Sequence, residues 1–482
     1  NTATGNLTGK NNVTVTAENA DVAGTVTAET GAANITATND LSIKEGSKVS
    51  GGSVGLKAGE NLNVAENAGV TATEGDATLA GKNISNSGTV MAEKGNVGVT
   101  ATEKFTNTAT GNLTGKNNVT VTAENADVAG TVTAEAGKAS VVAQDTATIT
   151  GTVSGGNVEL EGKNNLTINK NATVTATEGD ATLKGSTIEQ NGTVTAKQNA
   201  TLEGNTITNS GTVTAETGKV GVAATKTFTN TETGNLTGKT DVEVTAKDAN
   251  VAGTVTAEAG AANITATNDL SIKEGSKVSG GSVGLKAGEN LNVAENAGVT
   301  ATEGDATLAG KNISNSGTVT AEKGNVGVTA TEKFTNTATG NLTGKNNVTV
   351  TAENADVAGT VTAETGAANI TATNDLSIKE GSKVSGGSVG LKAGENLNVA
   401  KNAQVTATEG DATLAGKNIS NGGTVTASND VVVTATEKFT NTATGNLTGK
   451  NNVTVTAENA DVAGTVTAET GAANITATND LS

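Results

Sequence analysis

Proline, cysteine, histidine, tyrosine, tryptophan and arginine are all absent from this chain of 482 residues. Without cysteine the chain forms no disulfide, although that absence does not name a compartment. The lack of proline is typical of a chain built from paired strands, because proline has no backbone N–H to donate to a neighbouring strand. The sequence therefore favours uninterrupted hydrogen-bonded ladders.

Charge and hydropathy argue against two further classes of protein. The chain has 31 basic and 49 acidic residues, for a net charge of −18, and its lysines are scattered, so no basic stripe is available for phosphates. No apolar run approaches the length that spans a membrane. We expect neither nucleic-acid binding nor a membrane-spanning segment. With 34% hydrophobic and 1% aromatic residues, a chain without repeats would tend towards disorder.

Long repeats change that expectation. The stretch NTATGNLTGKNNVTVTAENADVAGTVTAE begins at Asn1, recurs unchanged from Asn107, Asn336 and Asn441, and recurs slightly altered from Asn230. Such self-similarity is typical of repeat architectures, in which each unit buries its apolar face against its neighbours. We predict a single continuous β-helix segment over residues 1–482, with sequence blocks 1–106, 107–229, 230–335, 336–440 and a partial block 441–482.

A finer period of about 20 residues lies inside the blocks. In the second block DATLKGSTIEQNGTVTAKQ, from Asp180, is followed by the near-copy NATLEGNTITNSGTVTAETG, from Asn199. A whole unit is inserted there without disturbing the sequence that follows. Each unit is therefore predicted to be one coil of a solenoid.

Alternation within a unit indicates strands. In the unit from Asn11 to Gly31, apolar and polar residues alternate over residues 13–17, 20–22 and 25–28, which predicts three short strands per coil. Glycine, and less readily asparagine, tolerates the left-handed backbone that a sharp corner needs, and stacked asparagines can hydrogen-bond along a ladder. The expected corners are Asn19, Asn39, Asn61 and Asn83 before the second strand, and Gly24, Gly46 and Gly88 before the third.

Strands at equivalent positions of successive coils run parallel, so we predict an all-β fold, a right-handed parallel β-helix (solenoid). The hand follows the strong preference of parallel crossovers. About 22 full coils at ~4.8 Å each would give a rod on the order of 100 Å long. The only aromatic residues occur in the contexts KFTN and TFTN and are expected to fill the core; they are Phe105, Phe228, Phe334 and Phe439.

Catalysis is not predicted. Parallel β-helices also house polysaccharide lyases and glycosidases, and two suitably spaced carboxylates can hydrolyse a glycoside. An active site is normally single, whereas the acidic corners of this chain recur with the block; they are Glu74-Gly75-Asp76, Glu178-Gly179-Asp180, Glu303-Gly304-Asp305 and Glu409-Gly410-Asp411. We expect no enzyme, no catalytic residue and no cofactor. These corners could hold calcium, but a solvated turn is the simpler interpretation, and no metal site is predicted.

Two surface patterns leave alternatives open. Outward threonines of the third strand would stack into a flat array resembling the ice-binding face of some β-helical antifreeze proteins; the pairs are Thr25/Thr27, Thr131/Thr133, Thr173/Thr175, Thr193/Thr195, Thr212/Thr214 and Thr254/Thr256. Lys48, Met91, Asn112 and Lys277 interrupt the array, and threonine is also a favourable outward strand residue in general. Asn-x-Ser/Thr triplets are frequent, as any alternating chain rich in threonine and asparagine would produce; they include Asn6, Asn12, Asn34, Asn83, Asn112, Asn118, Asn165, Asn235, Asn263, Asn341 and Asn446.

The phrase SGTVTAEKGNVGVTATEKFTNTATGNLTGKNNVTVTA, from Ser316, and the corner at residues 86–92 carry a family resemblance. Alternating Val/Leu and Thr/Ala runs are interrupted by N-G or S-G before a short GxVxA strand. The chain resembles, over its whole length, the haemagglutinin-type repeats of filamentous haemagglutinin-like exoproteins, the large two-partner secretion adhesins of Gram-negative bacteria. Autotransporter passenger domains share the same coil pattern, so both export routes stay open.

The resemblance implies a secreted, surface-tethered β-helical fibre of a Gram-negative bacterium that works in adhesion, cell aggregation or biofilm formation. Its implied partners are a host or neighbouring-cell surface or matrix and, if export is by two-partner secretion, an outer-membrane secretion partner. Because one face repeats with each block, lateral or end-to-end association between copies of the chain is also expected. Some adhesins of the family are glycosylated at Asn-x-Ser/Thr triplets, which is a further implication. Because residues 1–42 and 441–482 are identical and each cuts through a coil, we expect a segment of a longer chain.

Overall fold

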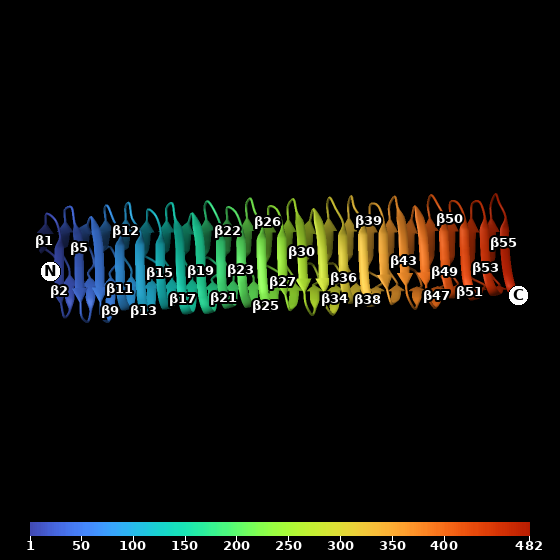
Figure 1. Ribbon diagram of the computed structural model, residues 1–482, viewed down its shortest axis with the longest axis horizontal. Coiled ribbons are helices and arrows are strands. Elements are labelled where there is room, and N and C mark those ends of the chain that lie inside the picture. The colour runs from blue at the N-terminus through green and yellow to red at the C-terminus, as the bar shows by residue number, and fades with distance from the viewer. The chain divides into compact units, whose positions relative to one another are not determined.

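The computed structural model describes residues 1–482, which form strands and turns and no helix. The chain divides into two compact units, Asn1–Thr240 (unit 1) and Asp241–Ser482 (unit 2). Within each unit the chain winds into coils, and strands at equivalent positions of successive coils pair in parallel (Figure 1). The prediction of an all-β parallel solenoid is confirmed. The hand of the coil stays a prediction.

The last strand of each coil is short and belongs to its own sheet, which we call the third face. In unit 1 it consists of β1 (Asn6–Gly9), β4 (Thr25–Ala28), β7 (Lys48–Gly51), β10 (Gly69–Ala72), β12 (Thr89–Ala92), β14 (Asn112–Gly115), β16 (Thr131–Ala134), β18 (Thr152–Gly155), β20 (Thr173–Ala176), β22 (Thr193–Ala196), β24 (Thr212–Ala215) and β26 (Asn235–Gly238). In unit 2 it consists of β29 (Thr254–Ala257), β32 (Lys277–Gly280), β35 (Gly298–Ala301), β37 (Thr318–Ala321), β39 (Asn341–Gly344), β42 (Thr360–Ala363), β45 (Lys383–Gly386), β48 (Gln404–Ala407), β50 (Thr424–Ala427), β52 (Asn446–Gly449) and β54 (Thr465–Ala468). These 23 strands, one per coil, agree with the coil number expected from the sequence.

The remaining strands form the first and second faces of the coils. In unit 1 they are β2 (Val13–Ala17), β3 (Ala20–Val22), β5 (Ala32–Ala37), β6 (Leu41–Ile43), β8 (Ser53–Ala58), β9 (Asn61–Val64), β11 (Ala77–Asn86), β13 (Val97–Asn107), β15 (Val119–Val128), β17 (Lys138–Ile149), β19 (Asn157–Ile168), β21 (Ala181–Gln190), β23 (Ala200–Asn209) and β25 (Val220–Asn230). In unit 2 they are β27 (Val242–Ala246), β28 (Asp248–Val251), β30 (Ala261–Ala266), β31 (Leu270–Ile272), β33 (Ser282–Ala287), β34 (Asn290–Val293), β36 (Ala306–Asn315), β38 (Val326–Asn336), β40 (Val348–Ala352), β41 (Asn354–Val357), β43 (Ala367–Ala372), β44 (Leu376–Ile378), β46 (Ser388–Ala393), β47 (Asn396–Val399), β49 (Ala412–Asn421), β51 (Val431–Asn441), β53 (Val453–Val462) and β55 (Ala473–Leu481).

Coils differ in how the first face joins the second. Some coils have two separate strands there, such as β2 and β3, whereas others have one long strand, such as β11. In β11 the pairing with β13 continues through the corner, because Gly81 still pairs with Ala101 and the register shifts only between Gly81 and Asn83. The prediction of three short strands in every coil is therefore wrong for the coils with a long strand, in which the corner keeps an extended, paired backbone.

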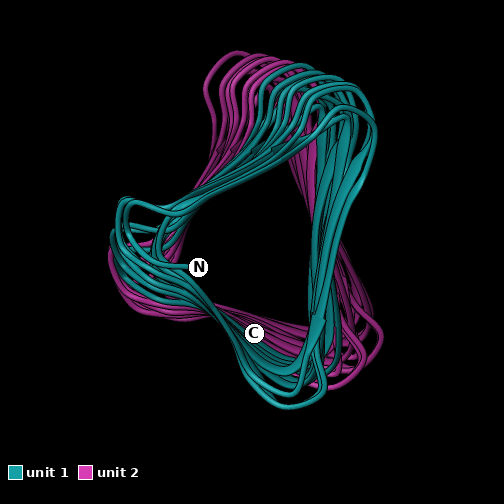
Figure 2. Ribbon diagram, turned by 90° about the vertical axis from the view of Figure 1, so that its left-hand side faces the viewer, with its two compact units in different colours: residues 1–240 teal, residues 241–482 magenta.

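Alternation along each strand fills the core. In β4 the side chains of Val26 and Ala28 are buried, and those of Thr25 and Thr27 lie half-buried on the outside. Val26 pairs with Leu7 on one side and Val49 on the other, so like positions stack along the axis of the coils. Burying one such aliphatic side chain stabilises the fold by about 1.5–3 kcal/mol. Figure 2, a view along the coils, shows the three-sided outline that this stacking produces within each unit.

The phenylalanines lie in the core, on strands that run along the second face. All four are fully buried. Phe105 pairs with Ile84 on one side and with the small Ala126 on the other, so the volume of the ring is offset by the missing volume of the alanine. Phe334 and Phe439 have the same neighbours, an isoleucine and an alanine. Their prediction as core residues is confirmed.

Glycine at the corner before the third strand serves two different purposes. Gly46 has a φ of +72°, the left-handed backbone expected from the sequence. Gly24 and Gly88 do not have positive φ; a Cβ at Gly24 would lie 2.1 Å from the carbonyl oxygen of Gly5, and one at Gly88 would lie 2.5 Å from that of Ala68. The left-handed explanation is therefore wrong at these two residues, where glycine is required because the backbones of neighbouring coils approach closely.

The corner asparagines also differ from expectation. None of Asn19, Asn39, Asn61 and Asn83 has positive φ. The left-handed asparagines are instead at the turn that precedes β10, β35 and β48; they are Asn67, Asn296 and Asn402, with φ of 59°, 59° and 60°. The predicted corner asparagines act through their side chains, as described below.

Candidate functional surfaces

In the Glu-Gly-Asp corners, the sequence's one candidate for a cation site, all four aspartates and two of the glutamates use their carboxylates within the fold. Asp76 Oδ1 accepts hydrogen bonds from the backbone N–H of Asn96 at 2.7 Å and from its side-chain amide at 3.0 Å. Glu74 accepts two hydrogen bonds from Lys94 Nζ, at 2.7 and 2.8 Å. The corner Glu303-Gly304-Asp305 repeats this arrangement. The chain contains no group of three or more acidic side chains placed to hold a metal ion.

Asp76 belongs to a column of aspartates and asparagines at the corner that opens the first face, which we call the Asx ladder. Asn96 Oδ1 accepts the backbone N–H of Asn118 at 3.0 Å, and Asn118 Oδ1 accepts that of Lys138 at 2.8 Å. Each such bond satisfies a backbone donor at a corner and stabilises the fold by about 1 kcal/mol. The other members are Asn12, Asn157, Asp180, Asn199, Asp241, Asp305, Asn325, Asn347, Asp411, Asp430 and Asn452.

A second column lies at the corner between the first and second faces. Asn83 donates from its amide to Asn61 Oδ1 at 3.2 Å, and Asn61 donates to Asp40 Oδ1 at 2.8 Å. The predicted ladder of asparagines is confirmed for Asn61 and Asn83, and Asn19 accepts the backbone N–H of Asp40 at 3.3 Å. The prediction is wrong for Asn39, which donates to Glu18 Oε1 at 3.3 Å while Asp40 takes its place in the column. The sequence did not lead us to expect that aspartates take part in both columns.

Buried asparagines at the ends of second-face strands were missed from the sequence. Asn86 and Asn107 are fully buried, and the Asn86 amide donates to Asn107 Oδ1 at 2.8 Å. Asn107 in turn donates to the carbonyl oxygens of Gly111 and Thr131, at 3.0 and 3.1 Å. The same pairing recurs at Asn209/Asn230, Asn315/Asn336 and Asn421/Asn441. These side chains satisfy backbone carbonyls at the entrance to the third face.

The third face carries the predicted threonine array. The first and third residues of each strand point outward, and from β16 to β24 all of them are threonine or serine. The columns are in register, since Thr173 pairs with Thr152 on one side and Thr193 on the other. Outside this run, the interruptions foreseen at Lys48, Met91, Asn112 and Lys277 are on the same face.

The Asn-x-Ser/Thr triplets lie in several different surroundings. Asn12 and Asn118 are engaged in the Asx ladder. Asn112 stands on the third face, where its Oδ1 accepts a hydrogen bond from the Thr114 hydroxyl at 3.0 Å. Asn34 is exposed on the first face. Glycosylation of these residues stays a prediction.

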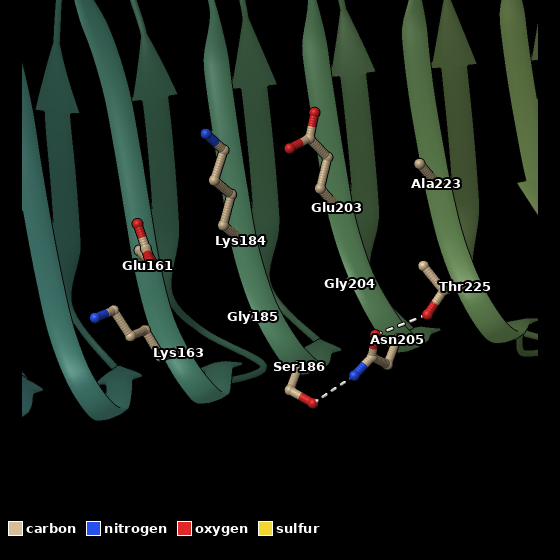
Figure 3. A pocket seen from close by; sticks show the side chains of 10 residues that line it. All are labelled: Glu161, Lys163, Lys184, Gly185, Ser186, Glu203, Gly204, Asn205, Ala223 and Thr225. Atoms are coloured by element: carbon tan, nitrogen blue, oxygen red, sulfur yellow. Dashed lines mark hydrogen bonds between the residues drawn. The ribbon is translucent and has the colours of Figure 1, made fainter.

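A shallow hollow of about 540 Å³ lies on unit 1 where the first face meets the second (Figure 3). Lys184 pairs along the stack with Glu161 on one side and Glu203 on the other, so charges alternate across its upper part. Below them Asn205 donates to Ser186 at 2.9 Å. The lining has no aromatic side chain on which a sugar ring could stack and no pair of converging carboxylates in a cleft. It offers polar contacts of the kind found all along the coils.

Lysines alternate with acidic residues in other columns too. Lys82 lies between Glu60 and Glu103, at 3.3 and 3.4 Å from their carboxylates; the hydrogen bond to Glu60, followed by the charge of Glu103, raises the pKa of Lys82. The hydrogen bond from Lys138 lowers the pKa of Glu159. Exposed pairs of this kind contribute little stability each. They do neutralise charge locally along the stack.

Comparison with known proteins identifies the repeat. The family model of the hemagglutinin repeat matches residues 64–169, 163–295 and 393–481, which together are more than half of the chain. No curated protein and no solved structure matches the chain. Among the elements described above there is no helix with the length and hydropathy needed to cross a membrane.

Proposed function

Because this chain belongs to the hemagglutinin-repeat family and is a filamentous haemagglutinin-like protein, we propose that it forms the shaft of a bacterial surface fibre that supports adhesion, cell aggregation or biofilm formation. The family indicates a secreted or cell-surface bacterial adhesin whose repeats are structural. A Gram-negative source, an outer-membrane secretion partner and a single continuous shaft over residues 1–482 are part of the proposal.

The observation that carries this proposal is that contacts between coils are in register and local. The near-copies β21 and β23 illustrate it, because Leu183 pairs with Leu202 and Ile188 with Ile207, so the core of one coil continues into the next. A coil can therefore be added or removed without rebuilding a distant part of the core. The number of coils therefore sets the length of the shaft directly.

The surface supports attachment through many weak contacts in preference to one deep site. The hollow around Lys184 is shallow, and similar polar hollows occur at residues 61–63 and again at residues 396–398. Repeated sites on one chain bind a surface with avidity that exceeds the affinity of any single contact. The partner is proposed to be a host or neighbouring-cell surface or matrix.

Imaging of intact cells with an antibody raised against this repeat tests the proposal. We expect label on the cell surface, arranged as fibres. Label confined to the cytoplasm, or globular surface particles, would refute the shaft.

A shortened chain tests the adhesive role. Removing residues 336–440 deletes one sequence block and joins equivalent positions, because NTATGNLTG begins both at Asn336 and at Asn441. We expect the shortened chain to fold and reach the surface, and cell attachment to fall because fewer contacts and less reach remain. Unchanged attachment of cells that carry the shortened chain at equal surface density would contradict the adhesive role of the shaft.

A further inference from the structure

Acidic residues are distributed unevenly around the coil, and the third face has none. The chain carries 49 acidic residues and a net charge of −18, yet no outward position of a third-face strand is aspartate or glutamate. The outward charges on this face are the lysines Lys48, Lys277 and Lys383. The other faces carry carboxylates on their outward positions, for example Glu159 and Glu161 on β19.

The corner that follows the third face carries more acidic than basic residues, and part of its charge is paired. Several of its glutamates are held in ion pairs with lysines of the neighbouring coil: Lys116 lies 3.0 Å from Glu135 and Lys197 lies 3.1 Å from Glu216. The same pairing occurs at Lys94–Glu74, Lys323–Glu303 and Lys345–Glu364. The outward positions of the third face itself therefore add no repulsion between carboxylates when two copies meet face to face.

The extent of the face suits a stable contact. In unit 1 it runs from β1 to β26, one four-residue strand per coil. At ~4.8 Å per coil and ~3.3 Å per residue, it measures about 58 Å by about 13 Å, or about 750 Å². A standard protein interface buries about 800 Å² on each partner. The face of one unit is therefore about the size that a specific interface needs.

We propose that the third face is a docking surface for a second copy of this chain, so that two chains associate side by side, face against face. Parallel columns of threonine present methyl and hydroxyl groups at a regular spacing, which lets two flat sheets interdigitate. The contact lacks aromatic anchors, so each coil contributes weakly and the affinity is the sum over many coils. This inference concerns the purified chain alone and is independent of the surface to which the shaft attaches.

Salt gives the contact a distinctive signature. The carboxylates of two docked chains lie on other faces, and their remaining repulsion is screened over about 8 Å at 0.15 M salt. Self-association of the full chain, measured by sedimentation at rising protein concentration, should therefore strengthen as salt rises from about 0.02 to about 0.5 M. Association held together by ion pairs between chains would weaken instead, and that result would overturn the proposal.

Two double variants with the same added charge locate the contact. Thr152→Glu with Thr193→Glu places two carboxylates on the third face, and Thr78→Glu with Thr120→Glu places two on the first face. All four threonines are exposed, and in each pair one coil separates the two positions. We expect the third-face variant to lose at least tenfold in association affinity, and the first-face variant to stay within twofold of the unmodified chain.

A charge-reversal mixture separates a lost contact from a lost fold. Thr152→Lys with Thr193→Lys, mixed with the third-face glutamate variant, should restore association, because opposite charges then meet across the interface. Equal loss in the first-face and third-face glutamate variants, or no rescue in the mixture, would overturn the proposal. An unmodified chain that stays monomeric under all conditions would also overturn the proposal. If that monomeric chain inhibits ice recrystallisation through the third face, the partner of this face would be a crystalline lattice and not a second copy.

Discussion

Substitution of a close-approach glycine tests the packing between coils most directly. A Cβ at Gly130 would lie 2.1 Å from the carbonyl oxygen of Gly111 and 2.4 Å from that of Thr108. Displacement of the Gly111 carbonyl away from this Cβ would weaken the hydrogen bonds that it accepts from the backbone N–H of Thr131 at 2.9 Å and from the Asn107 amide at 3.0 Å. Overpacking costs about 1–3 kcal/mol, and each buried polar group left unpaired adds about 1–3 kcal/mol. For Gly130→Ala we expect a local loss of about 3–5 kcal/mol.

Two other glycines provide matched controls. Gly69 has no positive φ, and a Cβ added there would have no other atom within 4 Å, so Gly69→Ala should change stability by less than about 1 kcal/mol, in the stabilising direction. Gly46 also has open space but a φ of +72°, so Gly46→Ala should cost about 1–2 kcal/mol through backbone strain alone. Gly130→Ala therefore reports crowding between coils, Gly46→Ala reports backbone strain, and Gly69→Ala reports the effect of replacing glycine with alanine alone.

Native-state hydrogen exchange is the suitable assay, because long repeat arrays do not unfold as a single cooperative unit. The reporting amides are Thr131, bonded to Gly111, and Thr152, bonded to Gly130 at 3.0 Å. A loss of about 3 kcal/mol corresponds to about two orders of magnitude in exchange rate. Unchanged exchange in Gly130→Ala, or an equal loss in Gly69→Ala, would show that close approach of neighbouring coils is not what selects glycine at this corner.

Three further variants probe the core, the buried asparagines and the ion pairs. Phe105→Ala should destabilise its coils by about 3–5 kcal/mol by leaving a cavity, measured by the same exchange method, with Phe105→Leu expected to recover most of the loss. Asn107→Leu should cost about 2–4 kcal/mol because the Asn86 amide and the Gly111 carbonyl lose a partner; a neutral result would mean that water replaces the side chain. Burial raises the pKa of Asp356, but the hydrogen bonds from Lys379 and Lys333 lower it by more than burial raises it, so the pKa lies below its ordinary value. The stabilisation that Asp356 provides is therefore present above the ordinary pKa of an aspartate and is lost as pH falls through the lower pKa of the folded state. Asp356→Asn should flatten this part of the acid dependence of thermal unfolding, and an identical pH profile would contradict the assignment.

The period and alternation of the sequence were sufficient to predict the parallel solenoid and its core. Residues such as Val26 and Phe105 are inward because alternation places them there, and stacking needs no long-range information. The corners were harder to predict. Whether a corner ends a strand or carries pairing through it, as at Gly81, depends on the backbone of the neighbouring coil, which composition does not reveal.

On the candidate functional surfaces, too, features that repeat along a strand were predicted, and most contacts between side chains of neighbouring coils were not. The threonine columns were predicted because threonine recurs at the outward positions of most third-face strands. Asn86 and Asn107 were missed, although alternation itself places both inward, two residues after Ile84 and Phe105. The partners of Asp76 and Glu74 lie about one coil away in sequence, and assigning them requires the register between coils.

The Asx ladder has a direction. Each side-chain oxygen belongs to the earlier coil and each backbone donor to the later one, as in the steps from Asp76 to Asn96 and from Asn96 to Asn118. The two ends of a stack of coils are therefore chemically unlike: the end that faces the C-terminus offers side-chain acceptors, and the end that faces the N-terminus offers backbone donors. A chain that emerges N-terminus first finds an acceptor already fixed by the coil before it at each corner that follows an asparagine or aspartate of the Asx ladder. Growth of the stack is thereby templated one way along the polypeptide, from the part already folded towards the part still arriving.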